Sequence, residues 1–102
     1  MSYTIQRTYQ ARKDLENIAQ YTHDVWGTPQ LRTYMAELDA TIQMLADQPE
    51  TQAQNESQYW LGLRSASHKN HYFIFYRVKG QSVELLRVLH QRRNWQSIML
   101  EK

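Results

Sequence analysis

The sequence contains no cysteine, and this absence excludes several classes of protein at once. Disulfide-stabilised secreted domains, thiolate zinc sites, iron–sulfur clusters and cysteine nucleophiles all require this residue. Long apolar runs are also lacking, since no segment approaches the roughly 20 residues of a membrane-spanning helix. The N-terminal stretch MSYTIQRTYQARKDL has no apolar signal core. We therefore expect a cytoplasmic protein that has no membrane partner.

Several motifs of catalytic and metal sites are missing as well. The chain has neither a glycine-rich phosphate loop nor a G-x-S-x-G nucleophile turn. His68 and His71 stand three residues apart near a predicted strand start, where such positions point to opposite faces. His23 and His90 belong to other predicted elements, and no carboxylate cluster joins them. We expect neither a metal site nor a cofactor.

The length and the charge distribution limit the organisation of the protein. With 102 residues of ordinary globular composition, the chain has the size of one small domain. Residues 1–55 hold four Lys and Arg against seven Asp and Glu, a net charge of −3, whereas residues 56–102 hold eight against three, a net charge of +5. The basic half suggests an acidic or polyanionic partner, and a solvated basic rim explains it equally well.

The spacing of apolar residues predicts a β-α-α-β-β-β order. Residues 3–7 alternate as in a short strand, and residues 11–26 and 28–49 carry apolar side chains every three or four positions, as in amphipathic helices. Gly27-Thr28-Pro29 joins these helices into a hairpin. A polar loop at residues 50–58 precedes three extended segments, at 59–65, 70–78 and 82–90.

These elements define an α+β fold, in which the helical hairpin packs on a small antiparallel sheet within a single domain, residues 1–102. Asp14 and Glu16 are expected on an exposed face of the first helix. The segment NHYFIFYRV is apolar on both faces, as in a central strand. The predicted core consists of Leu15, Ile18, Leu38, Ile42, Leu45, Ile74, Leu86 and Val88.

The C-terminal strands carry a group of arginines that allows two interpretations. Arg64, Arg87 and His90 lie on strands that become neighbours, where they would hold RNA phosphates or an acidic peptide. Alternatively, Arg64 and Arg87 pair internally with carboxylates such as Glu84 and support the sheet, which is the interpretation we favour. Arg92 and Arg93 follow the last strand, so we expect them to be exposed and to contact a partner.

Six segments in register resemble the ParE branch of the RelE/ParE toxin superfamily. They are DLENIAQY at 14–21, WG at 26–27, LADQP at 45–49, GLRS at 62–65, FIFYR at 73–77 and RVLHQRR at 87–93. The resemblance extends from about residue 3 to residue 95 in the order of the family. The superfamily has the same β-α-α-β-β-β order that the apolar spacing predicts.

The resemblance implies a toxin of a type II toxin–antitoxin pair, which acts in plasmid maintenance or in a stress response. ParE members inhibit DNA gyrase and are neutralised by a small ParD-like antitoxin. The antitoxin binds operator DNA, so the toxin is expected to reach that DNA only through its antitoxin. A homodimer and a hetero-oligomer with the antitoxin are both compatible with the resemblance.

The RelE branch instead cleaves mRNA on the ribosome, and the two branches share one fold. As a ribonuclease, this chain would use Arg64 and His90. However, Trp60 and Gly62 stand where RelE carries lysines, and Phe73 stands where it carries an arginine. These positions lack the positive charge that stabilises a transferring phosphate, so we predict no enzymatic activity. A third alternative is a non-toxic member that retains only antitoxin binding.

Residue roles follow from the same resemblance. The toxicity of the ParE branch is attributed to its C-terminal portion, so we expect Arg92, Arg93 and Trp95 to bind the target. Alternatively, Trp95 and Ile98 pack back onto the sheet as a short helix. An amphipathic antitoxin helix would lie between the helical hairpin and the sheet. The candidate aromatic contacts for the antitoxin are Tyr9, Tyr21 and Tyr34.

Overall fold

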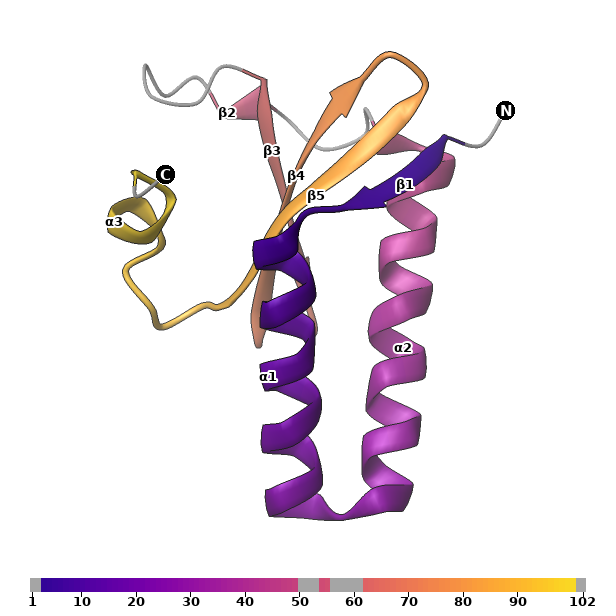
Figure 1. Cartoon of the computed structure of the whole chain (residues 1–102), viewed down its shortest axis with the longest axis vertical. Helices are drawn as coiled ribbons and strands as arrows, with labels where there is room; N and C mark the ends of the chain where they lie inside the picture. Colours follow the sequence, from indigo (N-terminus) through magenta and orange to yellow (C-terminus); the bar gives the residue numbers. More distant parts are fainter. Residues whose placement is uncertain (1–2, 50–53, 56–61, 101–102) are drawn as a thin grey trace.

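The computed structural model describes residues 3–49, 54–55 and 62–100. It confirms the α+β class and the predicted order of elements, and β2 is an addition within the predicted loop (Figure 1). Residues 59–61 of the third predicted strand lie outside the described residues. The elements are β1 (Thr4–Arg7), α1 (Tyr9–Trp26), α2 (Thr28–Asp47), β2 (Gln54–Asn55), β3 (Leu63–His68), β4 (Tyr72–Lys79), β5 (Ser82–His90) and α3 (Trp95–Leu100).

The strands form one sheet in the order β1-β5-β4-β3-β2. The pairs β3–β4 and β4–β5 are antiparallel, as predicted, and the added β2 also pairs antiparallel with β3. The pair β1–β5 is parallel, so the sheet is mixed rather than fully antiparallel. The chain leaves β1 through two helices and returns at the other edge of the sheet. The pairing of β1 with β5 therefore joins segments far apart in the sequence, which no local pattern records.

The helical hairpin begins at a capping residue, Thr8, and turns at a glycine, Gly27. The Thr8 side chain caps α1 by accepting a hydrogen bond from the Ala11 N–H at 3.1 Å. Gly27 has φ +87°, a conformation that favours glycine, and its N–H donates to the His23 carbonyl at 2.9 Å. Because the turn is this short, α1 and α2 lie antiparallel beside each other (Figure 1).

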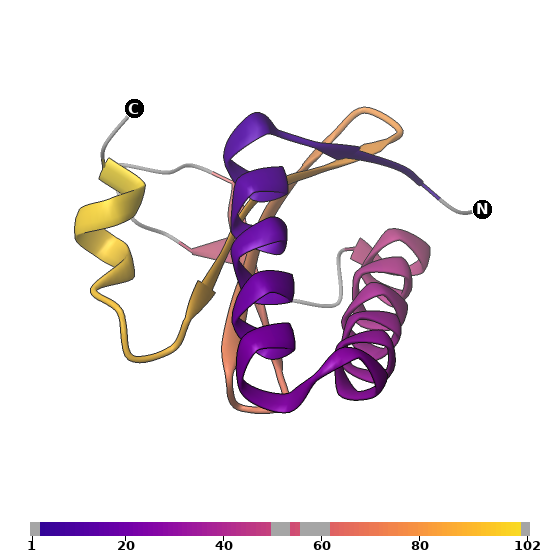
Figure 2. The same cartoon turned by 60° about the horizontal axis from the view of Figure 1, so that its bottom comes forward.

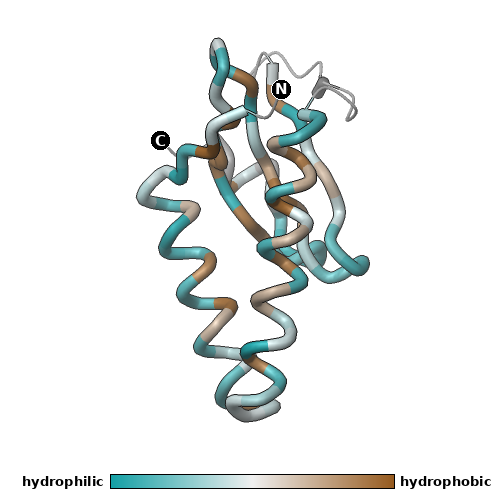
Figure 3. Tube along the Cα trace, turned by 90° about the vertical axis from the view of Figure 1, so that its right-hand side faces the viewer, coloured by the Kyte–Doolittle hydropathy of each residue, from teal (hydrophilic) through white to brown (hydrophobic). Residues whose placement is uncertain are grey.

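Each face of the sheet has its own apolar core. On the helix side, Ile74, Leu85 and Val88 pack against residues of both hairpin helices, including Ile18 and Leu38. Seven of the predicted core residues are buried, and Leu15 is half-buried against the same cluster. Figure 2 shows α3 on the other side of the sheet from α2, and Figure 3 shows brown and teal segments alternating along both long helices. Within the described residues, no helix combines the length and apolarity needed to cross a membrane.

Past Leu85, where the pairing with β1 ends, the edge of β5 lies against α1 rather than against another strand. Beyond the end of β1, the Asp14 carboxylate accepts hydrogen bonds from the Val88 N–H at 2.9 Å and from two guanidinium nitrogens of Arg87 at 2.8 and 2.9 Å. Asp14 is only 7% exposed, so its predicted place on an exposed helix face was wrong. Arg87 is paired internally, as favoured, but with Asp14, whereas Glu84 pairs with Arg77 at 2.6 Å.

Candidate functional site

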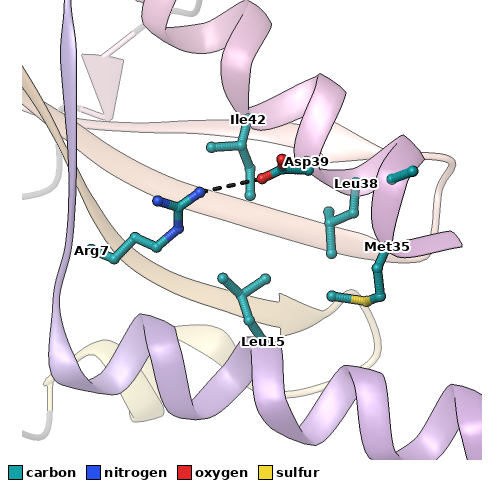
Figure 4. A pocket seen from close by; sticks show the side chains of 7 residues that line it. Arg7, Leu15, Met35, Leu38, Asp39 and Ile42 are labelled. Carbon is teal, nitrogen blue, oxygen red and sulfur yellow. Dashed lines mark hydrogen bonds and ion pairs between the residues drawn. The ribbon is translucent and has the colours of Figure 1, made fainter. Parts of the chain in front are cut away.

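Two hollows open along the helical hairpin. The first, named here the interhelical groove, has a volume of about 370 Å³ and an aliphatic wall. It lies between α1 and α2, and an ion pair between Arg7 Nη2 and Asp39 Oδ1 at 3.3 Å crosses it (Figure 4). The lining residues are Arg7, Leu15, Met35, Ala36, Leu38, Asp39 and Ile42. Its apolar wall and charged margin suit an amphipathic segment of another chain.

The second hollow, named the aromatic cleft, lies near the tip of the hairpin and also has a volume of about 370 Å³. Three sequence-distant regions meet there: the end of α1 with the start of α2, the β3–β4 turn with the start of β4, and the end of β5. Its lining residues are Tyr21, Thr22, Trp26, Gln30, Tyr34, His71, Tyr72 and His90.

The rings at the base of the aromatic cleft form a connected series. Tyr72 packs edge-on against His90 at 5.5 Å and against Tyr34 at 6.4 Å between ring centroids. The Tyr34 hydroxyl lies 3.4 Å from His71 Nδ1. Burial, followed by the nearby Tyr72 and Glu37, raises the pKa of Tyr34 to about 12, and burial also raises the pKa of Tyr72. A phenol with its ordinary pKa near 10 is already protonated at pH 7, and these shifts keep both hydroxyl groups protonated at still higher pH.

One hydrogen bond selects the tautomer of His90. Its Nδ1 accepts the backbone N–H of Arg92 at 3.1 Å, so the neutral ring carries its proton on Nε2. Nδ1 is consequently engaged as an acceptor, and in this tautomer the Nε2–H group is a hydrogen-bond donor.

His68 is buried next to the cleft, beneath Tyr34. Its ring packs edge-on against Tyr34 at 5.5 Å, and Nδ1 lies 2.8 Å from the Thr41 hydroxyl. Among the described residues, the other ring nitrogen, Nε2, has no hydrogen-bond partner. Burial, and secondarily the charge of Lys69, lowers the pKa of His68, so this ring is neutral at pH 7.

The two residues predicted for ribonuclease chemistry are not brought together. Arg64 pairs with Tyr76, and His90 pairs with Tyr72, on opposite sides of β4. Tyr72 and Tyr76 are four residues apart, which corresponds to about 13 Å along a strand. A general base and a phosphate-stabilising cation need to meet at one reacting group. The register places the backbones of Arg64 and His90 at different points along the sheet.

A basic turn follows β5 and is tied to the aromatic cleft by backbone hydrogen bonds. The Gln91 N–H donates to the His71 carbonyl at 2.9 Å, and the Arg93 N–H donates to the His90 carbonyl at 3.0 Å. Arg92 and Arg93 are exposed, as expected. The two exposed arginines therefore belong to a turn whose backbone is bonded to two residues of the cleft, His71 and His90.

Trp95 begins α3 and packs onto the sheet. Its ring lies 5.1 Å from the ring of Phe75, and Ile98 packs against the same cluster. The structure therefore confirms the short covering helix that we weighed as an alternative. Trp95 is half-buried rather than fully exposed, and its contact with the target stays a prediction.

The three tyrosines predicted to bind the antitoxin occupy two regions. Tyr9 lies at the start of α1, where it is 62% exposed and contacts Lys13. Tyr21, which is 60% exposed, and the half-buried Tyr34 lie in the aromatic cleft. The three residues therefore do not form one surface, and their role stays a prediction.

Sequence reasoning missed Trp26, Gln30 and Tyr72 as members of a site. The spacing places Trp26 in the apolar stripe of the first helix, yet its side chain is 67% exposed. A large aromatic residue directly before a helix-ending glycine is a signal that would have marked the hairpin tip.

For metals, residues 3–49, 54–55 and 62–100 contain no group of three or more His, Asp or Glu side chains placed to hold an ion.

The sequence matches a known family over most of its length. The sequence model of the family described as the ParE toxin of type II toxin–antitoxin systems matches residues 5–95. The toxin ParE1 of Caulobacter vibrioides is 40% identical over 84 residues, which cover 82% of this chain and 84% of that protein. The toxin ParE of Escherichia coli is 33% identical over 85 residues, which cover 83% and 82%.

Solved structures share the fold at lower sequence identity. A structure titled as the chromosomal ParDE toxin–antitoxin system from P. aeruginosa superposes with a TM-score of 0.74 and 19% identity, covering 87% of this chain and 96% of that chain. The toxin–antitoxin complex RelBE2 from Mycobacterium tuberculosis gives 0.65 and 24% identity, covering 89% and 100%. ParE-type and RelE-type proteins therefore both resemble this fold, so the fold alone does not separate their activities.

Proposed function

The chain belongs to the ParE toxin family of type II toxin–antitoxin systems, and from this membership we propose that it inhibits DNA gyrase and is neutralised by a ParD-like antitoxin. The observation that carries the proposal is the family match over residues 5–95. We also propose that the protein works in the cytoplasm, where gyrase and the antitoxin are present, and that it reaches operator DNA only within a hetero-oligomer with the antitoxin.

The proposal assigns inhibition to binding rather than to catalysis. The separation of Arg64 from His90 along β4 supports it. An inhibitor that binds gyrase needs a surface and no reacting group. We propose that Arg92 and Arg93 make charged contacts with gyrase, and that Trp95 holds this segment on the sheet or contacts gyrase itself.

We propose that the interhelical groove holds an amphipathic helix of the antitoxin. Leu15, Met35 and Ile42 offer an aliphatic wall to leucine-like side chains, and the exposed ion pair of Arg7 and Asp39 offers polar contacts at the margin. Tyr9, Tyr21 and Tyr34 would add contacts at the two ends of the hairpin. The groove is the stronger candidate for most of the affinity because buried aliphatic contacts contribute most of the favourable free energy.

A supercoiling assay tests the proposed target. Purified toxin, freed from its antitoxin, is added to gyrase from the native host together with relaxed plasmid. We expect a dose-dependent loss of supercoiling that the antitoxin reverses. The double variant Arg92→Ala with Arg93→Ala should inhibit less than the charge-matched control Arg12→Ala with Lys79→Ala, because Arg12 belongs to α1 and Lys79 pairs with Ser82, at the opposite end of β5 from the basic turn.

Unimpaired supercoiling by folded toxin that still binds its antitoxin would contradict gyrase inhibition. The next assay would then be mRNA cleavage on ribosomes, in which Arg64→Ala and His90→Ala should abolish activity if the chain is a ribonuclease. Absence of both activities, with antitoxin binding retained, would identify a non-toxic member.

A further inference from the structure

The lining of the aromatic cleft differs from that of a site for aliphatic side chains. Of the eight described residues that line it, four are Tyr or Trp, two are His, and none is Leu, Ile, Val or Met. None is a carboxylate either. A planar ring matches aromatic walls through stacked or edge-on contacts. An aliphatic side chain finds the better partner in the interhelical groove.

Two aromatic side chains of the cleft are largely exposed to solvent. Trp26 is 67% exposed and Tyr21 is 60% exposed, although both are large side chains near the hairpin tip. Tyr34 and Tyr72, by contrast, are half-buried and fixed against histidine rings. The cleft thus combines a base of packed rings with two exposed rings that can stack on a ligand.

Hydrogen-bond donors accompany these rings. The Tyr34 hydroxyl stays protonated, the Gln30 amide provides both a donor and an acceptor, and the His90 tautomer carries its proton on Nε2. A heterocyclic base offers ring nitrogens and carbonyl oxygens that accept such hydrogen bonds. The polar groups of the cleft therefore suit the edge of a base better than a purely apolar ring.

Positive charge lies next to the cleft. Arg92 and Arg93 are exposed on a turn whose backbone is bonded to His71 and His90. Lys69, which lies 6.0 Å from the centre of the Tyr34 ring, is paired with Glu37, so the two arginines of the turn carry the argument for positive charge. Stacking rings and neighbouring cations are the two features by which proteins bind single strands without sequence preference.

We propose that the aromatic cleft binds a base of single-stranded nucleic acid, with Arg92 and Arg93 on the neighbouring phosphates. This site goes beyond gyrase inhibition and does not depend on it. An acidic peptide is the competing ligand, but it would need an aliphatic surface for its apolar residues, and the cleft lacks one.

The test is fluorescence anisotropy with the full-length toxin and a labelled 12-mer of dT, with a 12-mer of rU and a 12-bp duplex in parallel. We expect saturable binding of at least one single strand and weaker binding of the duplex. Quenching of tryptophan fluorescence should accompany binding, because a base stacks on Trp26. Raising the salt from about 50 to about 200 mM should weaken binding roughly sevenfold if two phosphates are neutralised.

Matched variants separate stacking from general charge. Trp26→Ala should weaken binding about fivefold or more and remove the quenching, whereas Tyr9→Ala, an equally exposed aromatic on the same helix, should change neither. Arg92→Ala with Arg93→Ala should flatten the salt dependence, and Arg12→Ala with Lys79→Ala should not. Circular dichroism checks that each variant is folded.

Three results would overturn the inference. They are no saturable binding of either strand, an equal loss in Tyr9→Ala and Trp26→Ala, and displacement of the strand by an acidic peptide that binds more tightly. Gyrase inhibition is measured separately on the same variants. A toxin that binds dT but leaves supercoiling unimpaired would refute the proposed function while supporting this inference.

Discussion

The interhelical groove and the aromatic cleft have the same volume, about 370 Å³, yet they are opposites in chemistry. The groove has an aliphatic wall crossed by an ion pair, and the cleft has aromatic and imidazole walls. Both include residues of α1 and α2, and the cleft adds residues from the β3–β4 turn, β4 and β5. The difference arises from position along the hairpin. Figure 1 shows that the tip of the hairpin projects past the β3–β4 end of the sheet, and the cleft, unlike the groove, includes Trp26 next to the α1–α2 turn.

One small domain thus places an aliphatic and an aromatic binding surface at different points along a single pair of helices. Where the helices cover the sheet, residues such as Leu38 and Ile42 are buried and serve the core as well as the groove. Where the helices pass the sheet, Trp26 remains exposed and serves no core. A change in the groove should therefore alter antitoxin binding, and a change at the tip should leave stability intact.

The largest effect is expected from Asp14→Ala, which should disrupt both hollows. The change removes the carboxylate that accepts hydrogen bonds from the Arg87 guanidinium and the Val88 N–H, and with it the buried polar link between α1 and β5. Removing one member of a buried pair typically costs about 3–5 kcal/mol of the free energy of unfolding. Urea unfolding monitored by circular dichroism measures it, and a loss below about 1 kcal/mol would show that the pair contributes little.

The second effect concerns the groove alone. Met35→Gln keeps the length of the side chain but adds a polar amide to the aliphatic wall, so antitoxin binding should weaken about tenfold or more. Met44→Gln is the matched control, because Met44 is 62% exposed on the same helix and does not line the groove. Calorimetric titration with the cognate antitoxin compares them, and equal affinities for both variants would place the antitoxin elsewhere.

The third effect is a pH dependence that originates beside the cleft. Burial lowers the pKa of His68 below its ordinary value of 6.5. The unfolded chain therefore takes up a proton that the folded chain does not, and the free energy of unfolding falls as the pH drops through 6.5 toward the folded pKa. Urea unfolding at pH 7.5 and 5.5 measures the fall. His68→Gln should reduce it and the exposed His71→Gln should not; the reverse order would contradict the assignment.

The smallest effect is expected at the groove margin. Asp39→Ala removes the ion pair with Arg7. The Asp39 side chain is 72% exposed and the Arg7 side chain is 36% exposed, so the free energy of unfolding should change by less than about 1 kcal/mol. The same urea assay, run beside Asp14→Ala, separates a surface pair from a buried one. A loss as large as that of Asp14→Ala would mean that the margin holds the hairpin together.

Local patterns predicted most of the fold. The strand at residues 82–90 was predicted with the bounds of β5, and both helices of the hairpin end within two residues of their predicted ends. Apolar period, a helix-ending glycine and a strand apolar on both faces are local properties, which explains this success. The parallel pairing of β1 with β5 and the burial of Asp14 depend on distant segments, so no local pattern revealed them.

The candidate site was predicted only in pieces. Tyr21, Tyr34 and His90 were singled out for different roles, and the structure brings all three into one cleft. Trp26 was assigned to an apolar stripe because helical spacing does not show where a helix passes the end of a sheet. The internal pairing of Arg87 was anticipated, yet its partner lies 73 residues away in the sequence, beyond the reach of pattern analysis.

The most direct test of the contrast measures two ligands on two variants in one experiment. Met35→Gln and Trp26→Ala are each titrated with the cognate antitoxin and with the 12-mer of dT. Separate sites predict that Met35→Gln loses antitoxin affinity about tenfold while its binding of dT is unchanged. They also predict that Trp26→Ala loses dT affinity about fivefold, with a much smaller change toward the antitoxin. Parallel losses of both ligands in both variants would contradict the account and show that the hairpin has a single binding surface.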